Sequence, residues 1–121
     1  KNPNGYLGRG RAYKKIKEFD LAEDDFLKTI NLGLKTPLVY RIIAAFYFDI
    51  RNYKQSIFYY DLAIKNTDQD IDNSSNYFFR GYSKKNLNKI SDACQDFDIA
   101  LKLSPENKNF EKIYQKNCNK E

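Results

Sequence analysis

The 121-residue chain contains no histidine and only two cysteines. Without histidine, no Ser-His-Asp or Cys-His pair can form, and the commonest general base and metal ligand is missing. Two cysteines are too few for a disulfide framework or a cysteine-based metal cluster. The sequence therefore argues against an enzyme and against a bound metal or other cofactor.

Long apolar runs and a recognisable signal peptide are also missing. Hydrophobic residues make up 41% of the chain and charged residues 31%, as in an ordinary soluble helical domain, and the length supports one domain over residues 1–121. Methionine is absent even at position 1. We therefore expect a processed protein or a domain of a longer one. Its compartment stays open, with the cytoplasm slightly favoured.

The two cysteines, Cys94 and Cys118, fall on two different predicted helices. The simplest interpretation is a pair of free or half-buried thiols. A bridge between them requires that their Cα atoms lie within about 7 Å of each other. The sequence leaves that alternative open.

Three copies of one unit make up most of the chain. Tyr6 and Tyr77 each begin a Tyr-x-x-Arg-Gly signature, and Tyr40 begins a copy with alanine in place of the glycine. Tyr40 follows Tyr6 by 34 residues, and Tyr77 follows Tyr40 by three more than that. A fixed period in this range indicates a solenoid, whose units bury their apolar faces by stacking. The other repeated positions are Gly10, Ala44 and Gly81; Phe19, Tyr53 and Ile90; Ala22, Ser56 and Ala93; and Phe26, Tyr60 and Phe97.

Each copy is predicted to be a helical hairpin. The small residues let two helices approach closely, and the large rings fill the space between neighbouring pairs. Apolar residues recur at helical steps, and acidic residues gather where the second helices of the first and third copies begin. The predicted helices are 4–16, 19–32, 38–50, 53–65, 75–87, 90–103 and 107–118, the last of them a cap for the solenoid.

These positions resemble the tetratricopeptide-repeat (TPR) pattern of aromatic, Gly, Tyr, Ala, Phe, Ala and Pro at set offsets. Further matches are Tyr13, Tyr47, Ala63, Ala100 and Pro105, and departures are Lys84, Thr29, Leu34 and Asp68. The resemblance implies an all-α, right-handed superhelix of three helix-turn-helix repeats and a capping helix. The repeats are predicted at 3–36, 37–70 and 74–107, and the cap at 106–119. Short bacterial TPR proteins are similar.

Several acidic and glycine-containing segments invite other interpretations. Glu23–Asp25 and the pair Asp92 and Asp96 are predicted to lie on a solvated outer face rather than in a catalytic site. The segment 8–10 lacks the third glycine of a phosphate-binding fingerprint. The segment 68–73 begins like a calcium loop but has Asn73 where glycine is needed and Phe79 where glutamate is needed. We expect an ordinary polar loop within residues 66–76.

In the resembled family, the first helix of each hairpin lines a concave groove. The predicted first helices carry eight basic residues, among them Arg9, Arg80 and Lys84, against the single acid Asp49. The resemblance places fifteen residues in the groove. Eleven are predicted to bind a partner: Asn4, Leu7, Arg11, Lys14, Lys15, Arg41, Phe48, Phe78, Tyr82, Lys85 and Asn86. Leu38, Ala45, Asp49 and Ser75 complete the set.

A basic groove with aromatic anchors predicts a non-catalytic adaptor that binds an acidic peptide segment of a partner protein. The Lys and Asn clamp that holds chaperone C-termini is missing, because its positions are Leu7, Arg11, Ile42, Ser75 and Phe79. The main alternative is a scaffold or homo-oligomer that stacks through the uncapped first repeat. Nucleic-acid binding is less favoured, because the second helices are acidic. No small-molecule substrate and no membrane contact is expected.

Overall fold

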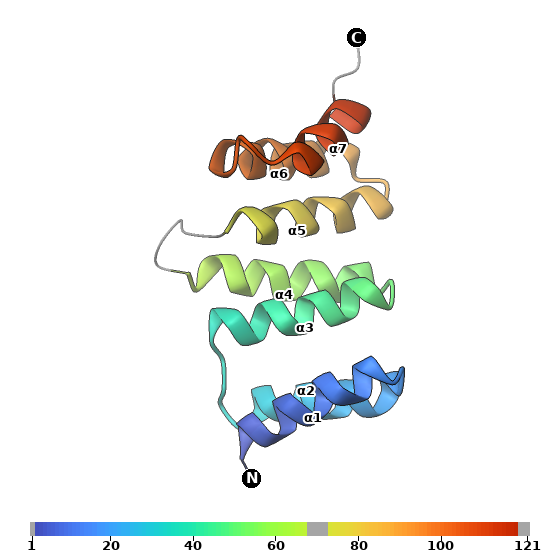
Figure 1. The fold of residues 1–121 in the computed structure, drawn as a ribbon, viewed down its shortest axis with the longest axis vertical. Helices are drawn as coiled ribbons and strands as arrows, with labels where there is room; N and C mark the ends of the chain where they lie inside the picture. The colour runs from blue at the N-terminus through green and yellow to red at the C-terminus, as the bar shows by residue number, and fades with distance from the viewer. Residues whose placement is uncertain (1, 68–72, 119–121) are drawn as a thin grey trace.

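The computed structural model describes residues 2–67 and 73–118, and these residues form seven helices and no strand. Every helix lies within one residue of its predicted bounds. Figure 1 shows the helices stacked along the long axis, with the first hairpin at one end of the stack and the last helix at the other. The helices are α1 (Pro3–Lys15), α2 (Phe19–Asn31), α3 (Pro37–Asp49), α4 (Tyr53–Lys65), α5 (Ser74–Asn86), α6 (Ile90–Leu103) and α7 (Lys108–Cys118).

The helices pack as the hairpins α1/α2, α3/α4 and α5/α6, with α7 against α6. Polar caps begin several of them: the Thr36 hydroxyl accepts from the Val39 amide at 3.2 Å, and the Asn107 carboxamide accepts from the Phe110 amide at 3.0 Å. Of the segment that resembles a calcium loop, 68–73, residues 68–72 lie outside the described residues, so that expectation is not tested.

The turn inside each hairpin uses the same backbone geometry. Lys17, Arg51 and Asn88 occupy equivalent positions and have φ of 65°, 66° and 65°. After each of them, an amide reaches back five residues to a carbonyl, as from Glu18 to Tyr13 at 2.9 Å. This is the arrangement that ends a helix with one left-handed residue, and glycine adopts it at least cost.

Replacing Lys17 or Arg51 with glycine is expected to raise the free energy of unfolding by about 0.5–1 kcal/mol each, because a left-handed lysine or arginine is strained. Asn88→Gly is the matched control and should change stability much less, since asparagine tolerates this conformation. Urea denaturation of the three variants measures the difference. Equal effects at all three positions would contradict the argument.

Two glycines are required by close packing rather than by their backbone angles. A Cβ on Gly10 would lie 2.9 Å from the ring of Phe26, and one on Gly81 would lie 3.0 Å from the backbone oxygen of Ala93. The equivalent Ala44 is fully buried. The small residues of the repeat therefore do what the sequence predicted and let the two helices of a hairpin touch.

The C-terminal end is closed by α7. Phe110 is buried and stacks on Phe78, with ring centroids 4.4 Å apart. Cys94 and Cys118 are joined by a disulfide with a Cα–Cα distance of 5.6 Å, so the expectation of two free thiols is wrong. Sequence could not supply this distance, which depends on how α7 folds back over α6.

Across residues 2–67 and 73–118, no helix is long and apolar enough to cross a membrane. Within the same ranges, no group of three or more His, Cys, Asp and Glu side chains is placed to hold a metal ion.

Candidate functional site

A continuous depression runs along the face built by α1, α3 and α5, which we call the groove. Its first cavity, of about 690 Å³, lies between α1 and α3, and a second of about 360 Å³ lies between α3 and α5. Both cavities are bordered by Arg11, Ile42 and Ala45, so they are parts of one surface. A third, of about 470 Å³, adjoins the second at Phe79 and is lined by Phe48, Tyr82 and Asn86 among others.

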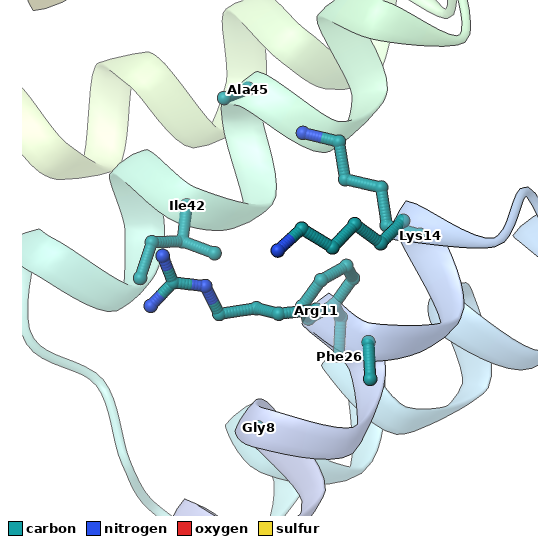
Figure 2. A pocket seen from close by; sticks show the side chains of 8 residues that line it. Gly8, Arg11, Lys14, Phe26, Ile42 and Ala45 are labelled. Carbon is teal, nitrogen blue, oxygen red and sulfur yellow. The ribbon is translucent and has the colours of Figure 1, made fainter.

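The first cavity has an apolar base and a basic rim. Ile42 and Ala45 of α3 form one wall, and Phe26 of α2, itself fully buried, lies at the bottom. Figure 2 shows the side chains of Arg11 and Lys14 extending from α1 into the space in front of α3. The exposed Lys15 lines the same cavity.

Most of the positive charge of the groove is unpaired. Arg11, Lys15 and Arg41 form no salt bridge with any described residue. Lys14 differs, because its ammonium lies 2.7 Å from the carboxylate of Asp49 across the groove. Lys85 lies over the ring of Tyr82, 5.2 Å from its centroid. Unpaired guanidinium and ammonium groups favour a negatively charged ligand.

Three of the eight basic residues counted on the predicted first helices face away from the groove. Arg9 binds Asp25 through two hydrogen bonds of 2.8 and 2.9 Å, and Arg80 binds Asp96 through two of 2.9 and 2.7 Å. Lys84 also binds Asp96, at 3.0 Å. The groove is therefore less basic than the sequence alone suggested, although Arg11, Lys15 and Arg41 remain available in it.

The same contacts overturn the prediction of a solvated face for Asp25 and Asp96, whereas Asp24 and Asp92 are exposed as predicted. Asp25 and Asp96 are each 2% exposed, and each is held by an arginine of the partner helix in its hairpin. Glu23 also has a packing contact, because it accepts a 2.7 Å hydrogen bond from the Tyr47 hydroxyl. Asp25, Asp96 and Glu23 are part of the packing between helices.

Arg80 also joins two repeats. Its second terminal nitrogen donates to Asp61 of α4 at 2.7 Å while the others hold Asp96. Burial lowers the pKa of the Arg80 guanidinium, but the hydrogen bonds and charges of Asp96 and Asp61 outweigh burial and raise it above its ordinary value. Arg80 is thus permanently charged and fixes the packing of α4, α5 and α6.

The predicted apolar anchors divide into two kinds. Phe78 is only 6% exposed and packs on Phe97 and Phe110, so it belongs to the core and the prediction that it faces the groove is wrong. Phe48 and Tyr82 are half-buried, lie edge to face at 5.8 Å and line the third cavity. They can contact a ligand.

The remaining predicted positions lie around these cavities. Asn4 is exposed near the start of α1 and does not line the three described cavities. Leu7 is half-buried and packs against the core. Leu38 and Ser75 line the second cavity. Their role as binding residues stays a prediction.

One polar group in the groove was not predicted. Asn76 lines the second cavity and is 5% exposed. Its side-chain nitrogen donates to the carboxamide of Asn73 at 2.9 Å, but its Oδ1 has no hydrogen-bond partner among the described residues. A buried acceptor left unpaired is destabilising, and because protein atoms cover this oxygen it is not open to a ligand in the groove.

The first cavity exists because the two junctions between repeats are built differently. At the second junction, the small Ser56 and Ser83 meet through their hydroxyls at 3.0 Å. At the first junction, the position equivalent to Ser83 is Phe46, whose buried ring lies 5.1 Å from that of Phe26. Consequently α2 and α3 approach less closely than α4 and α5. The sequence contained this signal, because Ala12 and Ser83 occupy the same column as Phe46.

Two buried tyrosines make stability sensitive to high pH. Burial, with the Glu23 hydrogen bond, raises the pKa of Tyr47 above its ordinary 10.0, and burial also raises that of Tyr60. The unfolded chain therefore loses these protons first as the pH passes 10, so stability is intact below that pH and falls above it. Urea denaturation between pH 8 and 11.5 should show the free energy of unfolding falling as the pH rises. The fall should be less steep in the double variant Tyr47→Phe/Tyr60→Phe. Identical pH profiles for the double variant and the original protein would contradict the prediction.

Comparison with known proteins identifies the fold. No protein-family model matches the sequence, and no curated protein does. The first TPR domain of Spaghetti (RPAP3) superimposes with a TM-score of 0.82 at 21% identity, over 97% of this chain and 90% of that one. The Arabidopsis OM64 TPR domain gives 0.82 at 23% identity over 97% and 94%. The second TPR domain of human RPAP3 gives 0.80 at 24% over 99% and 100%.

The chain therefore folds as a TPR superhelix, as its sequence predicted. Solenoids of this kind present an extended concave surface for binding. The groove along α1, α3 and α5 lies on the face formed by the first helix of each hairpin.

Proposed function

We propose that this chain is a non-catalytic interaction module that binds an acidic peptide segment of a partner protein in the groove. The observation that carries the proposal is the set of cations Arg11, Lys15 and Arg41, which have no salt-bridge partner in the described part of the chain and lie along a depression with apolar walls. Carboxylates supply the matching charge, and the neighbouring apolar surface supplies the contact area.

Two similar domains offer a parallel. One was solved with the HSP90 peptide SRMEEVD and another with the HSP70 peptide SGPTIEEVD, both of which end in acidic residues. We do not propose those ligands for this chain, because only Arg11 among its five clamp positions can hold a carboxylate. The shared feature is the class of ligand, a short acidic peptide.

The test uses a library of fluorescein-labelled twelve-residue peptides, half of whose positions are Asp or Glu, measured by polarisation. Arg11→Glu/Lys15→Glu/Arg41→Glu is expected to weaken binding at least tenfold. The matched control is Lys54→Glu/Lys65→Glu/Lys112→Glu, which makes the same charge change at exposed positions on α4 and α7. It should bind within about twofold of the original.

Equal losses in the two variants would mean that overall charge, rather than the groove, attracts the peptides. Competition by a single-stranded oligonucleotide of equal charge would favour nucleic acid instead. Circular dichroism establishes that both variants keep their helices.

A second candidate function rests on the outer face of the first hairpin. Arg80 is shared by Asp96 and by Asp61 of the preceding repeat, whereas the equivalent Arg9 is 55% exposed and, among the described residues, has Asp25 as its one carboxylate partner. An acid-bearing helix of another protein would supply the missing carboxylate. Head-to-tail stacking of this chain is opposed by α7, which covers α6 and is tied to it by the disulfide.

Light scattering over a hundredfold concentration range separates these possibilities. A constant monomer mass supports peptide binding in the groove or binding of a helix from another protein. A mass that rises with concentration, with the rise abolished by Arg9→Glu, would support self-association.

A further inference from the structure

We infer that the first cavity is a specificity subsite that accepts an aromatic side chain from the acidic peptide. The inference rests on the proposed function, because it specifies what the peptide must contain. Acidity alone would not distinguish one peptide from another, whereas a shaped cavity beside the cations can.

The cavity is a feature of this chain's own sequence rather than of every repeat junction. Phe46 stands where the other copies have Ala12 and Ser83, and its ring separates α3 from α2. Ile42 stands where the third copy has Phe79, whose ring stacks on Tyr60 at 6.3 Å and 17°. The second junction thus holds an aromatic ring of its own, and the first has a shorter side chain bordering an open cavity of about 690 Å³.

The walls and rim suit a ring better than an aliphatic chain. The walls are apolar, formed by Ala12, Ile42 and Ala45 with Phe26 beneath. The rim carries Arg11 and Lys15, whose cationic groups can lie over the face of an inserted ring. The chain uses this contact repeatedly: Arg9 lies 5.5 Å from the Tyr6 centroid, Lys85 lies 5.2 Å from that of Tyr82, and Arg80 lies 5.2 Å from that of Tyr77.

The neighbouring cavity suits the peptide main chain. It shares Arg11, Ile42 and Ala45 with the first cavity, so a peptide anchored in one passes directly into the other. There the hydroxyl of Ser75, a half-buried residue that lines the cavity, can hydrogen-bond to the peptide main chain. Flanking Asp or Glu side chains then lie within reach of Arg41 and Lys15. The fitting ligand is therefore an aromatic residue with acidic residues on both sides.

Three labelled peptides test the inference, each with three alternating Asp and Glu residues on either side of a central Phe, Leu or Ala. The Phe peptide is expected to bind at least tenfold more tightly than the Ala peptide, because the ring buries a large apolar area. The Leu peptide should fall between them.

Ile42→Phe fills the cavity from α3, as Phe79 does at the second junction. In this variant the Phe peptide and the Ala peptide should bind with nearly equal affinity, so that their affinity ratio is close to one. Its matched control is Ile99→Phe, at an exposed position on α6, which should keep the full ratio. Ala12→Leu fills the cavity from α1 at an exposed position and keeps the test available if Ile42→Phe does not fold.

The outcomes separate the two proposals. Binding of all three peptides with equal affinity would overturn the aromatic subsite and leave the acidic groove intact. A ratio unchanged by both filling variants would place the ring elsewhere and overturn the inference. Failure of all three peptides to bind would overturn the proposed function together with it.

Discussion

Asp96→Ala is expected to lower the free energy of unfolding by about 3–5 kcal/mol, because it removes a buried partner from two cations. The carboxylate is 2% exposed and accepts from Arg80 at 2.7 and 2.9 Å and from Lys84 at 3.0 Å. Arg80, with a side chain only 18% exposed, would keep Asp61 as its one carboxylate partner among the described residues. Urea denaturation followed by circular dichroism measures the loss.

Two other acids serve as controls for this prediction. Asp98 pairs with Lys102 one turn along α6, and their side chains are 46% and 76% exposed, so Asp98→Ala should change stability by less than about 0.5 kcal/mol. Asp25→Ala removes the same kind of pair as Asp96→Ala, but Arg9 is largely exposed and water can replace the lost contacts. We expect Asp25→Ala to lower the free energy of unfolding by about 1.5 kcal/mol. Equal losses for Asp25→Ala and Asp96→Ala would mean that burial of the arginine does not matter.

The fold could be predicted because it depends on repeated local requirements. Small residues at Gly10, Ala44 and Gly81 and rings at Phe26 and Phe97 recur at fixed offsets, and each is needed for two helices to touch or for two hairpins to stack. Three independent copies of the same requirement make the pattern unmistakable. Helix bounds followed from the same periodicity.

The buried ion pairs were missed because charged residues were assigned to a solvated face. A comparison of the copies contains the signal. Arg9 and Asp25 are sixteen residues apart, as are Arg80 and Asp96, and the structure bonds each pair across a hairpin. In the second copy the equivalent residues are the buried Ile43 and Tyr59, so both partners of the pair are replaced together.

The groove was predicted only in outline. Its helices and several cations followed from the repeat, but the direction of each side chain depends on packing at particular junctions. Phe78 turns into the core because α7 brings Phe110 against it, and Arg80 turns away from the groove because Asp61 and Asp96 hold it. The contacts of Phe78 with Phe110 and of Arg80 with Asp61 join residues of different units, and no recurrence between the copies indicates them.

Phe46→Ala is expected to lower the free energy of unfolding by about 3 kcal/mol or more, as large-to-small changes of buried aromatic residues do. The Phe46 side chain is fully buried and contacts the rings of Phe26 and Tyr47, each with its centroid 5.1 Å away. Phe58→Ala is the matched control, because that ring is 52% exposed on α4. Phe58→Ala should lower the free energy of unfolding by less than about 1 kcal/mol.

The stability lost in Phe46→Ala also shows whether α2 and α3 move together once the ring is removed. If α2 and α3 stay apart, the vacated space becomes a cavity and the full loss is observed. If they close to the spacing that Ser56 and Ser83 allow at the second junction, the loss shrinks and the cavity between α1 and α3 narrows with it. A loss below about 1 kcal/mol, with Phe-peptide binding unchanged, would contradict the role assigned to Phe46 in holding the junction open. Stability and peptide affinity measured on this one variant therefore test whether the same ring that stabilises the stack also shapes the groove.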